Sequence, residues 1–168
     1  SSDGPVVDRR GEPTDRVAYP PIADYAVIGD CGTAALVARS GSIDWLCLPH
    51  FSGPAVFAAL LDYSHGGRFA VGPVAPATVN RRYFGTSNVL ETTFLTATGT
   101  LRITDAMPVA GTAGGIEPLR EVIRVIEVVA GDVEIEIIYE PRFDFGRRRP
   151  RLRRRGRLGW CCEYGEHW

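Results

Sequence analysis

Carboxylates are the side chains of this sequence that could do acid–base chemistry. Asp44 and Asp105 lie within or just after segments with a strand pattern, and Asp30 follows a third such segment in a predicted turn. Two carboxyl groups that face each other across a cleft could act as general acid and general base. Nothing in their spacing pairs two of them, and acids in turns and on strands usually cap the turn or face solvent. We therefore expect structural roles for most of these acids.

Metal and nucleophile chemistry lack their usual motifs. The sequence has no GxSxG, P-loop, HExxH or dinucleotide-binding glycine pattern. The glycine-rich segment 111–115 lacks the helix and following Lys-Ser/Thr of a phosphate loop, and we interpret it as a hairpin loop. The cysteines form no CxxC pair, and no zinc spacing involves the three histidines; they are Cys31, Cys47, Cys161 and Cys162. We expect reduced thiols in a cytoplasmic protein, with no metal and no cofactor.

Charge is distributed unevenly along the chain. All 19 basic residues are Arg; residues 1–141 hold 10 Arg and 17 acidic residues, whereas residues 142–168 hold 9 Arg and 3 acidic residues. The Arg-rich segment 147–157 could bind phosphates with a strong salt dependence, but it lacks the interleaved aromatic residues on which bases stack. A solvated hairpin that balances the acidic part of the chain, or that faces an acidic neighbouring domain, is favoured. Nucleic-acid binding is the lesser alternative.

Short apolar segments alternate with turn formers from residue 22 onward, which is typical of a β-rich fold. Residues 133–137 alternate apolar and acidic side chains, so one face of this strand is expected to be buried. Residues 119–129 are rich in β-branched side chains and are predicted to form a strand, joined to 133–137 by a hairpin turn at Gly131-Asp132. The other predicted strands are 25–28, 33–38, 43–47, 68–71, 78–84, 88–96 and 100–107.

Residues 55–61 differ from the strand segments because they contain good helix formers and follow Pro54. They predict one short helix of about two turns. Trp45, in an apolar strand, and Phe57, on the apolar face of this helix, are expected to be buried. Many short strands and one short helix predict a mainly-β fold, an antiparallel β-sandwich.

The length of 168 residues is that of one domain or a piece of one. No apolar run approaches the roughly 18 residues of a membrane helix, so no membrane partner is expected. Residues 1–21 are polar and rich in Pro and Gly, and we expect them to form a flexible leader.

Two long segments carry a resemblance to a known family, IADYAVIGDCGTAALV at 22–37 and GSIDWLCLP at 41–49. Shorter matching pieces lie at 54–61, 66–69, 83, 86–92, 105–108 and 139–146. Over about residues 22–160 the sequence resembles the N-terminal domain of bacterial family 15 glycoside hydrolases, the trehalase-like and glucoamylase-like group. The resemblance implies a supersandwich-like β domain that precedes an (α/α)₆ barrel. It also implies hydrolysis of α-glucosidic bonds with inversion, by two glutamates of the barrel.

The resemblance implies that this chain lacks both the barrel and its catalytic pair. We therefore expect a non-catalytic part of a hydrolase, an incomplete sandwich over 22–160, whose partner is a catalytic barrel domain. Residues 161–168 are expected to form an atypical tail that does not continue as a strand. A sandwich that ends early leaves strand edges unpaired, so self-association of the chain is also expected.

Four residues are candidates for a role toward substrate or toward the neighbouring domain: Asp44, Trp45, His50 and Phe51. The family usually has Arg-Phe-Asp-Ser-Pro where this chain has HFSGP at 50–54, which weakens the assignment of this loop. A free-standing carbohydrate-binding module, with an α-glucoside as ligand, is the alternative. Such a module needs exposed aromatic side chains on one flat face, and the candidates are Trp45, Tyr63, Tyr83 and Phe84.

Overall fold

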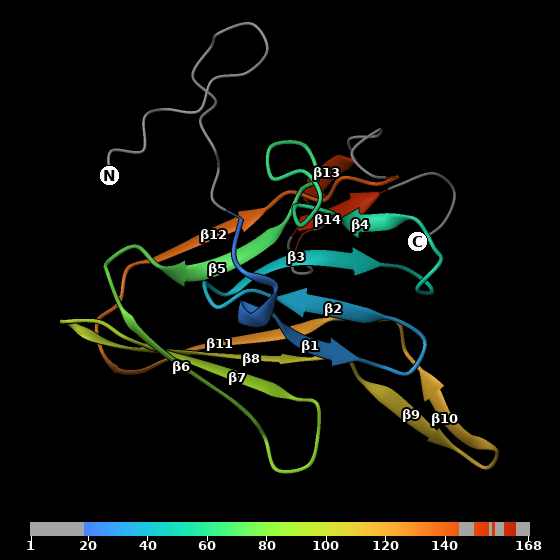
Figure 1. Cartoon of the computed structure of the whole chain (residues 1–168), viewed down its shortest axis with the longest axis horizontal. Helices are drawn as coiled ribbons and strands as arrows, with labels where there is room; N and C mark the ends of the chain where they lie inside the picture. The colour runs from blue at the N-terminus through green and yellow to red at the C-terminus, as the bar shows by residue number, and fades with distance from the viewer. Residues whose placement is uncertain (1–18, 145–149, 155, 157–159, 164–168) are drawn as a thin grey trace, which may run out of the picture.

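Two antiparallel β-sheets face each other in the structure, a computed structural model that describes residues 19–144, 150–154, 156 and 160–163. The six-stranded sheet has the order β1-β2-β3-β5-β12, with β4 paired to β3. Its strands are β1 (Ala26–Gly29), β2 (Ala34–Val37), β3 (Ser42–Cys47), β4 (Ala55–Phe57), β5 (Phe69–Pro73) and β12 (Ile135–Tyr139). Figure 1 shows this sheet in the upper half of the view and the second sheet below it.

The second sheet has four strands in the order β11-β8-β7-β6. They are β6 (Thr78–Tyr83), β7 (Leu90–Leu95), β8 (Gly99–Ala106) and β11 (Ile123–Gly131). Two separate hairpins are formed by β9 (Val109–Thr112) with β10 (Gly115–Pro118), and by β13 (Arg151–Arg154) with β14 (Trp160–Glu163). The predicted mainly-β antiparallel sandwich is confirmed, and each of the predicted strands overlaps a strand of the structure.

The apolar core lies between the two sheets. Along β7 and β8, buried and less buried residues alternate, as the period of two in a strand requires. Leu101 and Ile103 of β8 pack with Val71 of β5 and Phe94 of β7. A neighbouring cluster contains Ile28, Ala35, Val37, Ile43, Leu46, Val56, Phe57, Leu90 and Met107. The alternating burial along β7 and β8 therefore reflects one face of their sheet turned toward the other sheet.

The prediction of a short helix at 55–61 is wrong. Residues 55–57 form strand β4, in which Phe57 pairs with Leu46 and Ala55 with Cys47. The backbone N–H of Ala58 then donates to the carbonyl of Gly66. Pairing with β3 satisfies the backbone and buries Phe57, so a tertiary contact overrides a modest helix propensity. A 3₁₀ turn, η1 (Ile22–Asp24), precedes β1.

The predicted hairpin at Gly131-Asp132 is also wrong, although both of its strands exist. β11 pairs with β8 in the four-stranded sheet, and β12 pairs with β5 in the six-stranded sheet. Gly131, at a φ of 64°, begins the crossing from one sheet to the other. The N–H of Asp132 donates to the carbonyl of Thr98. The chain therefore links two layers here.

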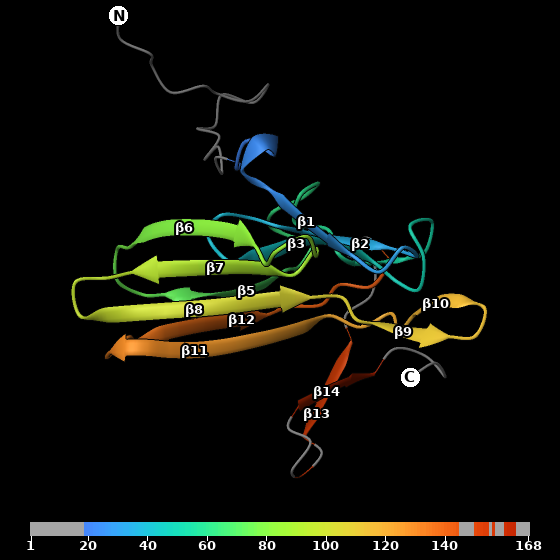
Figure 2. The same ribbon diagram turned by 90° about the horizontal axis from the view of Figure 1, so that it is seen from below.

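The two small hairpins extend from the sandwich, as Figure 2 shows. β9 and β10 enclose the glycine-rich segment 111–115, so the predicted hairpin loop is confirmed. In β13, Arg151, Arg153 and Arg154 are exposed, which confirms a solvated hairpin for the described part of the Arg-rich segment. Residues 147–149, 155 and 157 lie outside the described residues. The expectation of no strand in the tail is wrong for β14, which reaches Glu163.

The predicted leader, residues 1–21, falls mostly outside the described residues, which begin at Tyr19. Tyr19 contacts the body of the domain, because its hydroxyl accepts a hydrogen bond from the N–H of Tyr63 at 3.1 Å and the two rings meet edge to face. In the described part of the chain, no helix has the length and apolar character needed to cross a membrane.

Candidate functional site

A β-bulge in strand β3 places Asp44 on the outer face of the six-stranded sheet. Ile43 pairs with Val37 and Trp45 with Leu36, so Asp44 is the extra residue between two paired positions. A bulge puts two residues opposite one and breaks the strict alternation of side chains. Ile43 consequently lies in the core between the sheets, whereas Asp44 lies beside a cavity on the other side.

Asp44 is buried, with 2% of its surface exposed, and accepts two hydrogen bonds from neutral hydroxyls. The Tyr25 hydroxyl donates to Oδ2 at 2.7 Å, and the Ser42 hydroxyl donates to Oδ1. The pKa of Tyr25 is raised, first by burial and second by its hydrogen bond to Asp44, so the phenol stays protonated and remains a donor. Each carboxylate oxygen keeps a further lone pair for another donor.

A cavity of about 300 Å³ lies on this outer face, above strands β3, β5 and β12. Ser42 and Asp44 from β3 line it together with Glu136 from β12. The loop between β4 and β5 contributes Tyr63 and Arg68. The remaining lining residues are Pro20, Ser40, Ala70, Val71, Gly72, Pro73 and Ile138.

Arg68 is held over an aromatic ring at the edge of this cavity. Its guanidinium carbon lies 4.3 Å from the centroid of the Tyr63 ring, a distance at which a cation is attracted to the ring face. Its backbone pairs with Glu140. The buried Nε has no hydrogen-bond partner, which is uncommon for a buried polar atom. The side chain is therefore fixed in place with unused hydrogen-bonding capacity.

The structure brings only Asp44, of the four predicted site residues, to this cavity. Trp45 is half-buried, contrary to the expectation of burial, because the bulge turns it to the outer face, where it packs against Cys47, Ala55 and Ala58. His50 and Phe51 follow β3 in an exposed loop, and 64% of Phe51 is exposed. The four residues thus do not form one site.

Sequence reasoning missed Arg68 and Glu136 as site residues. A sequence pattern could have indicated Glu136, because it lies on the polar face of the alternating segment 133–137. No such pattern indicated Arg68, since it enters the site through the pairing of its backbone with Glu140, a contact between distant parts of the sequence.

Comparison with known proteins identifies the family. The profile described as "Trehalase-like, N-terminal" matches residues 15–158. The chain belongs to the trehalase-like N-terminal domain family. It is 36% identical to the trehalase of Mycolicibacterium smegmatis and 37% identical to that of Mycobacterium tuberculosis, covering 88% and 79% of this chain. The trehalase of Thermoplasma volcanium is 38% identical over 79% of this chain. No solved structure matches the sequence significantly.

The trehalase-like domain spans only 25% of the length of the M. smegmatis trehalase and 21% of the other two. Its remaining buried acids have internal partners. Asp30 accepts the N–H groups of Gly32, Thr33 and Arg120. Asp105 is paired with Arg124 between the sheets. Among the described residues, no three His, Cys, Asp or Glu side chains gather as metal ligands would.

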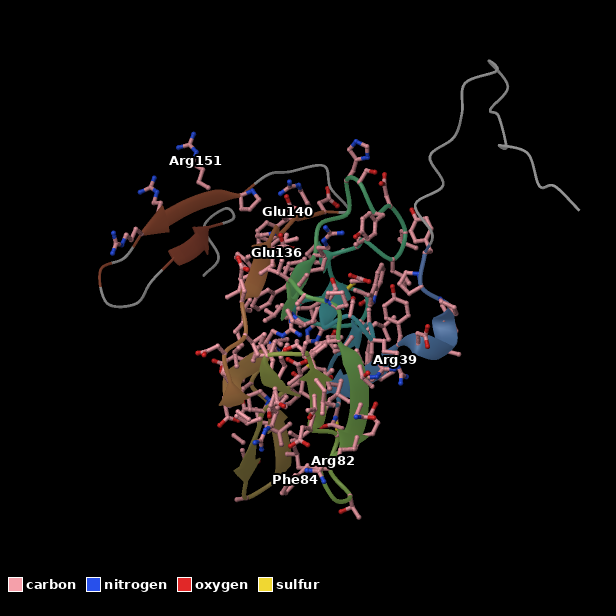
Figure 3. The ribbon with its side chains drawn as sticks, turned by 90° about the vertical axis from the view of Figure 1, so that its left-hand side faces the viewer. Arg39, Arg82, Phe84, Glu136, Glu140 and Arg151 are labelled. Carbon is pink, nitrogen blue, oxygen red and sulfur yellow. The ribbon has the colours of Figure 1, made fainter. Side chains whose placement is uncertain are left out.

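The aromatic residues considered as sugar platforms of the trehalase-like domain do not present free faces together. Arg68 lies over the ring of Tyr63. Tyr83 is tied through its hydroxyl to the backbone N–H and carbonyl of Val27, at 3.0 and 2.9 Å. Figure 3 shows Phe84 at the far end of the molecule from Glu136 of the cavity. A flat stacking surface is not built from these residues.

Proposed function

We propose that this chain is the non-catalytic N-terminal domain of a family 15 glycoside hydrolase that acts on trehalose or a related α-glucoside in carbohydrate metabolism. In this proposal a separate barrel domain holds the two catalytic carboxyl groups, and the reaction inverts the anomeric centre. The relatives named trehalase support the substrate class. They are four to five times as long as the segment that they share with this chain, which supports a catalytic partner domain.

The hydrogen-bond partners of the buried carboxylates are the observation that supports a non-catalytic role. Inversion needs one protonated carboxyl group and one carboxylate, about 6.5–9.5 Å apart with room for a water between them. Asp30, Asp44 and Asp105 are the buried acids of the described chain. Each is bonded to its own set of donors, respectively backbone N–H groups, two hydroxyls and one guanidinium. None of the three has a second carboxyl group among these partners, as an acid–base pair would need.

Exposed apolar side chains support the docking of further polypeptide. The edge strand β11 exposes Val125, Val128 and Val129, and the edge strand β12 exposes Ile137. These two strands end their respective sheets. Unpaired strand edges and contiguous exposed apolar residues are features of surfaces that another segment covers.

The test compares three proteins for glucose release from trehalose, maltose and maltodextrin. They are this chain, the catalytic part of the M. smegmatis trehalase, and a fusion in which this chain replaces the N-terminal quarter of that enzyme. We expect no hydrolysis by the chain, and a fusion that is more active and more heat-stable than the catalytic part by itself. Glucose release by the chain that is lost in Asp44→Asn would contradict the proposal. A fusion that is no more active and no more heat-stable than the catalytic part would contradict a role of this chain in supporting the catalytic domain.

A further inference from the structure

We propose that the cavity above strands β3, β5 and β12 binds one neutral polyol of the size of a monosaccharide. The proposal goes beyond the supporting role of the domain, because docking to a catalytic partner requires no ligand in this cavity. It rests on the position of Asp44, Arg68 and Glu136 around a single hollow.

The volume of the cavity sets the size of the ligand. About 300 Å³ is at the lower end of pockets that hold small molecules, which matches one sugar ring. Strands β3, β5 and β12 form its floor, so the polar groups there are fixed by the sheet. Ala70 of β5 has only a methyl group and Gly72 has no side chain, which leaves the space above β5 open between Asp44 and Glu136.

The charges around the cavity favour a neutral ligand. Two carboxylates, Asp44 and Glu136, and one guanidinium, Arg68, line it. An anion would meet the net negative charge of this set. A cation would be attracted by the carboxylates but would also lie beside the guanidinium, whereas a neutral molecule with hydroxyls can bond to groups of both signs. A metal ion lacks a ligand set, because no three His, Cys, Asp or Glu side chains come together among the described residues.

The hydrogen-bonding groups specify hydroxyls. A hydroxyl both donates and accepts, and a polyol presents several at short spacing. Asp44 and Glu136 accept, whereas the Arg68 guanidinium donates, and its buried Nε has no hydrogen-bond partner among the described residues. Hydrogen bonds to charged groups are stronger than those between neutral groups. A vicinal diol could therefore bridge a carboxylate and the guanidinium.

The test is a titration of the chain followed by ¹H–¹⁵N NMR, with D-glucose, acetate and methylammonium as separate probes. We expect saturable, millimolar binding of D-glucose, with shifts at the amides of Tyr63, Arg68, Gly72 and Glu136. The charged probes should cause no saturable shift there. The readout is binding and not hydrolysis, so its outcome is separate from that of the proposed function.

Glu136→Gln and Glu140→Gln form a matched pair for this test. Glu136 is the second residue of β12 and Glu140 follows its last residue (Figure 3), but of the two only Glu136 lines the cavity. Glu136→Gln should weaken glucose binding about tenfold, the loss expected for a hydrogen bond to a charged group, and Glu140→Gln should not change it. Arg68→Met should also weaken binding. Because Arg68 is half-buried, the ¹H–¹⁵N spectrum of the Arg68→Met variant must first show that this variant is folded.

Three outcomes would overturn the proposal. The first is no saturable response to glucose in the wild-type chain. The second is saturable binding of acetate or methylammonium in place of glucose, which would make the cavity an ion site. The third is glucose binding that Glu136→Gln and Glu140→Gln affect equally, which would place the sugar elsewhere.

Discussion

Asp44 and Asp105 are two buried carboxylates on strands of opposite sheets, with contrasting surroundings. Asp105 lies between the sheets, where Arg124 donates to Oδ1 from Nε at 2.7 Å and to Oδ2 from Nη2 at 3.1 Å. The same guanidinium donates to the carbonyls of Phe69 and Gly41 in the other layer. Asp44 has only neutral hydroxyl donors and lies beside an open cavity.

The contrast shows that the partners of a buried acid decide what it can do. Arg124 neutralises Asp105 and joins the two sheets, and both groups are inaccessible, with 2% and 0% of their side chains exposed. Asp44 has no cation among its hydrogen-bond partners and retains acceptor capacity toward the cavity. The first acid stabilises the sandwich, and the second is available to a ligand.

The largest expected effect comes from breaking the buried ion pair between Asp105 and Arg124 with Arg124→Met. Burial raises the pKa of Asp105, and Arg124 opposes this rise through its hydrogen bonds and charge. Removing the guanidinium leaves a buried carboxyl group and two carbonyls without donors. The free energy of unfolding should fall by about 3–5 kcal/mol, the usual cost of breaking a buried pair. Urea denaturation of the chain measures this loss.

Arg39→Met is the matched control for Arg124→Met. Arg39 is exposed and makes one hydrogen bond, to the carbonyl of Val79 at 3.2 Å. Its replacement should cost about 0.5 kcal/mol or less, as for most surface substitutions. If Arg124→Met cost no more than this control, the link between the sheets through Asp105 would not be a source of stability.

An intermediate loss of stability is expected at Asp44, the acid beside the cavity, in Tyr25→Phe. The substitution keeps the ring and removes the donor to Asp44 Oδ2. Hydrogen bonds to charged groups contribute about 1.5–3 kcal/mol, and the loss should lie at the lower end of this range because the Ser42 hydroxyl remains as a donor to Asp44. Urea denaturation at neutral pH measures the difference from the wild-type chain.

The effect of Tyr25→Phe should depend on pH in the alkaline range. The pKa of Tyr25 is raised in the folded state, mainly by burial. Its hydroxyl therefore stabilises the fold fully below the usual tyrosine pKa of about 10, and less as the pH rises above it. The difference between wild-type and Tyr25→Phe should shrink from about pH 8 to about pH 11. The cost of Arg124→Met should not follow this change, and a parallel change would remove the distinction between the two acids.

The strands could be predicted from the sequence because their signals are local. The alternation in 133–137 and the β-branched residues of 119–129 identified β12 and β11. The sheet that each strand joins could not be predicted in this way, because it depends on contacts between segments that are distant in the sequence. The turn at Gly131-Asp132 has the residues of a hairpin, yet β11 pairs in the four-stranded sheet and β12 in the six-stranded sheet. The helix prediction for 55–61 failed for the same reason, since pairing with β3 determines the structure of residues 55–57.

The candidate site was predictable only at Asp44. Trp45 follows Asp44 in the strand, and a regular strand would place it on the opposite face. The bulge at Asp44, which depends on the register between β2 and β3, changes this. Arg68 and Glu136 reach the cavity from a loop and from a distant strand. Residues that tertiary pairing brings together carry no shared pattern in the sequence.

The smallest expected effect adds a partly buried carboxylate, paired with an exposed arginine, to the comparison, in Glu91→Gln. Glu91 accepts a hydrogen bond from Arg82 Nε at 2.7 Å at the surface of the four-stranded sheet. This hydrogen bond is the main reason that the pKa of Glu91 is lowered. A lowered pKa stabilises the fold above the usual glutamate pKa of about 4.3, and the contribution is lost as the pH falls. Glu91→Gln should cost about 0.2–1 kcal/mol at neutral pH, as for ion pairs at the surface, and less at about pH 3. Urea denaturation at both pH values tests this, and a cost that equals that of Arg124→Met would show that burial does not rank these three acids.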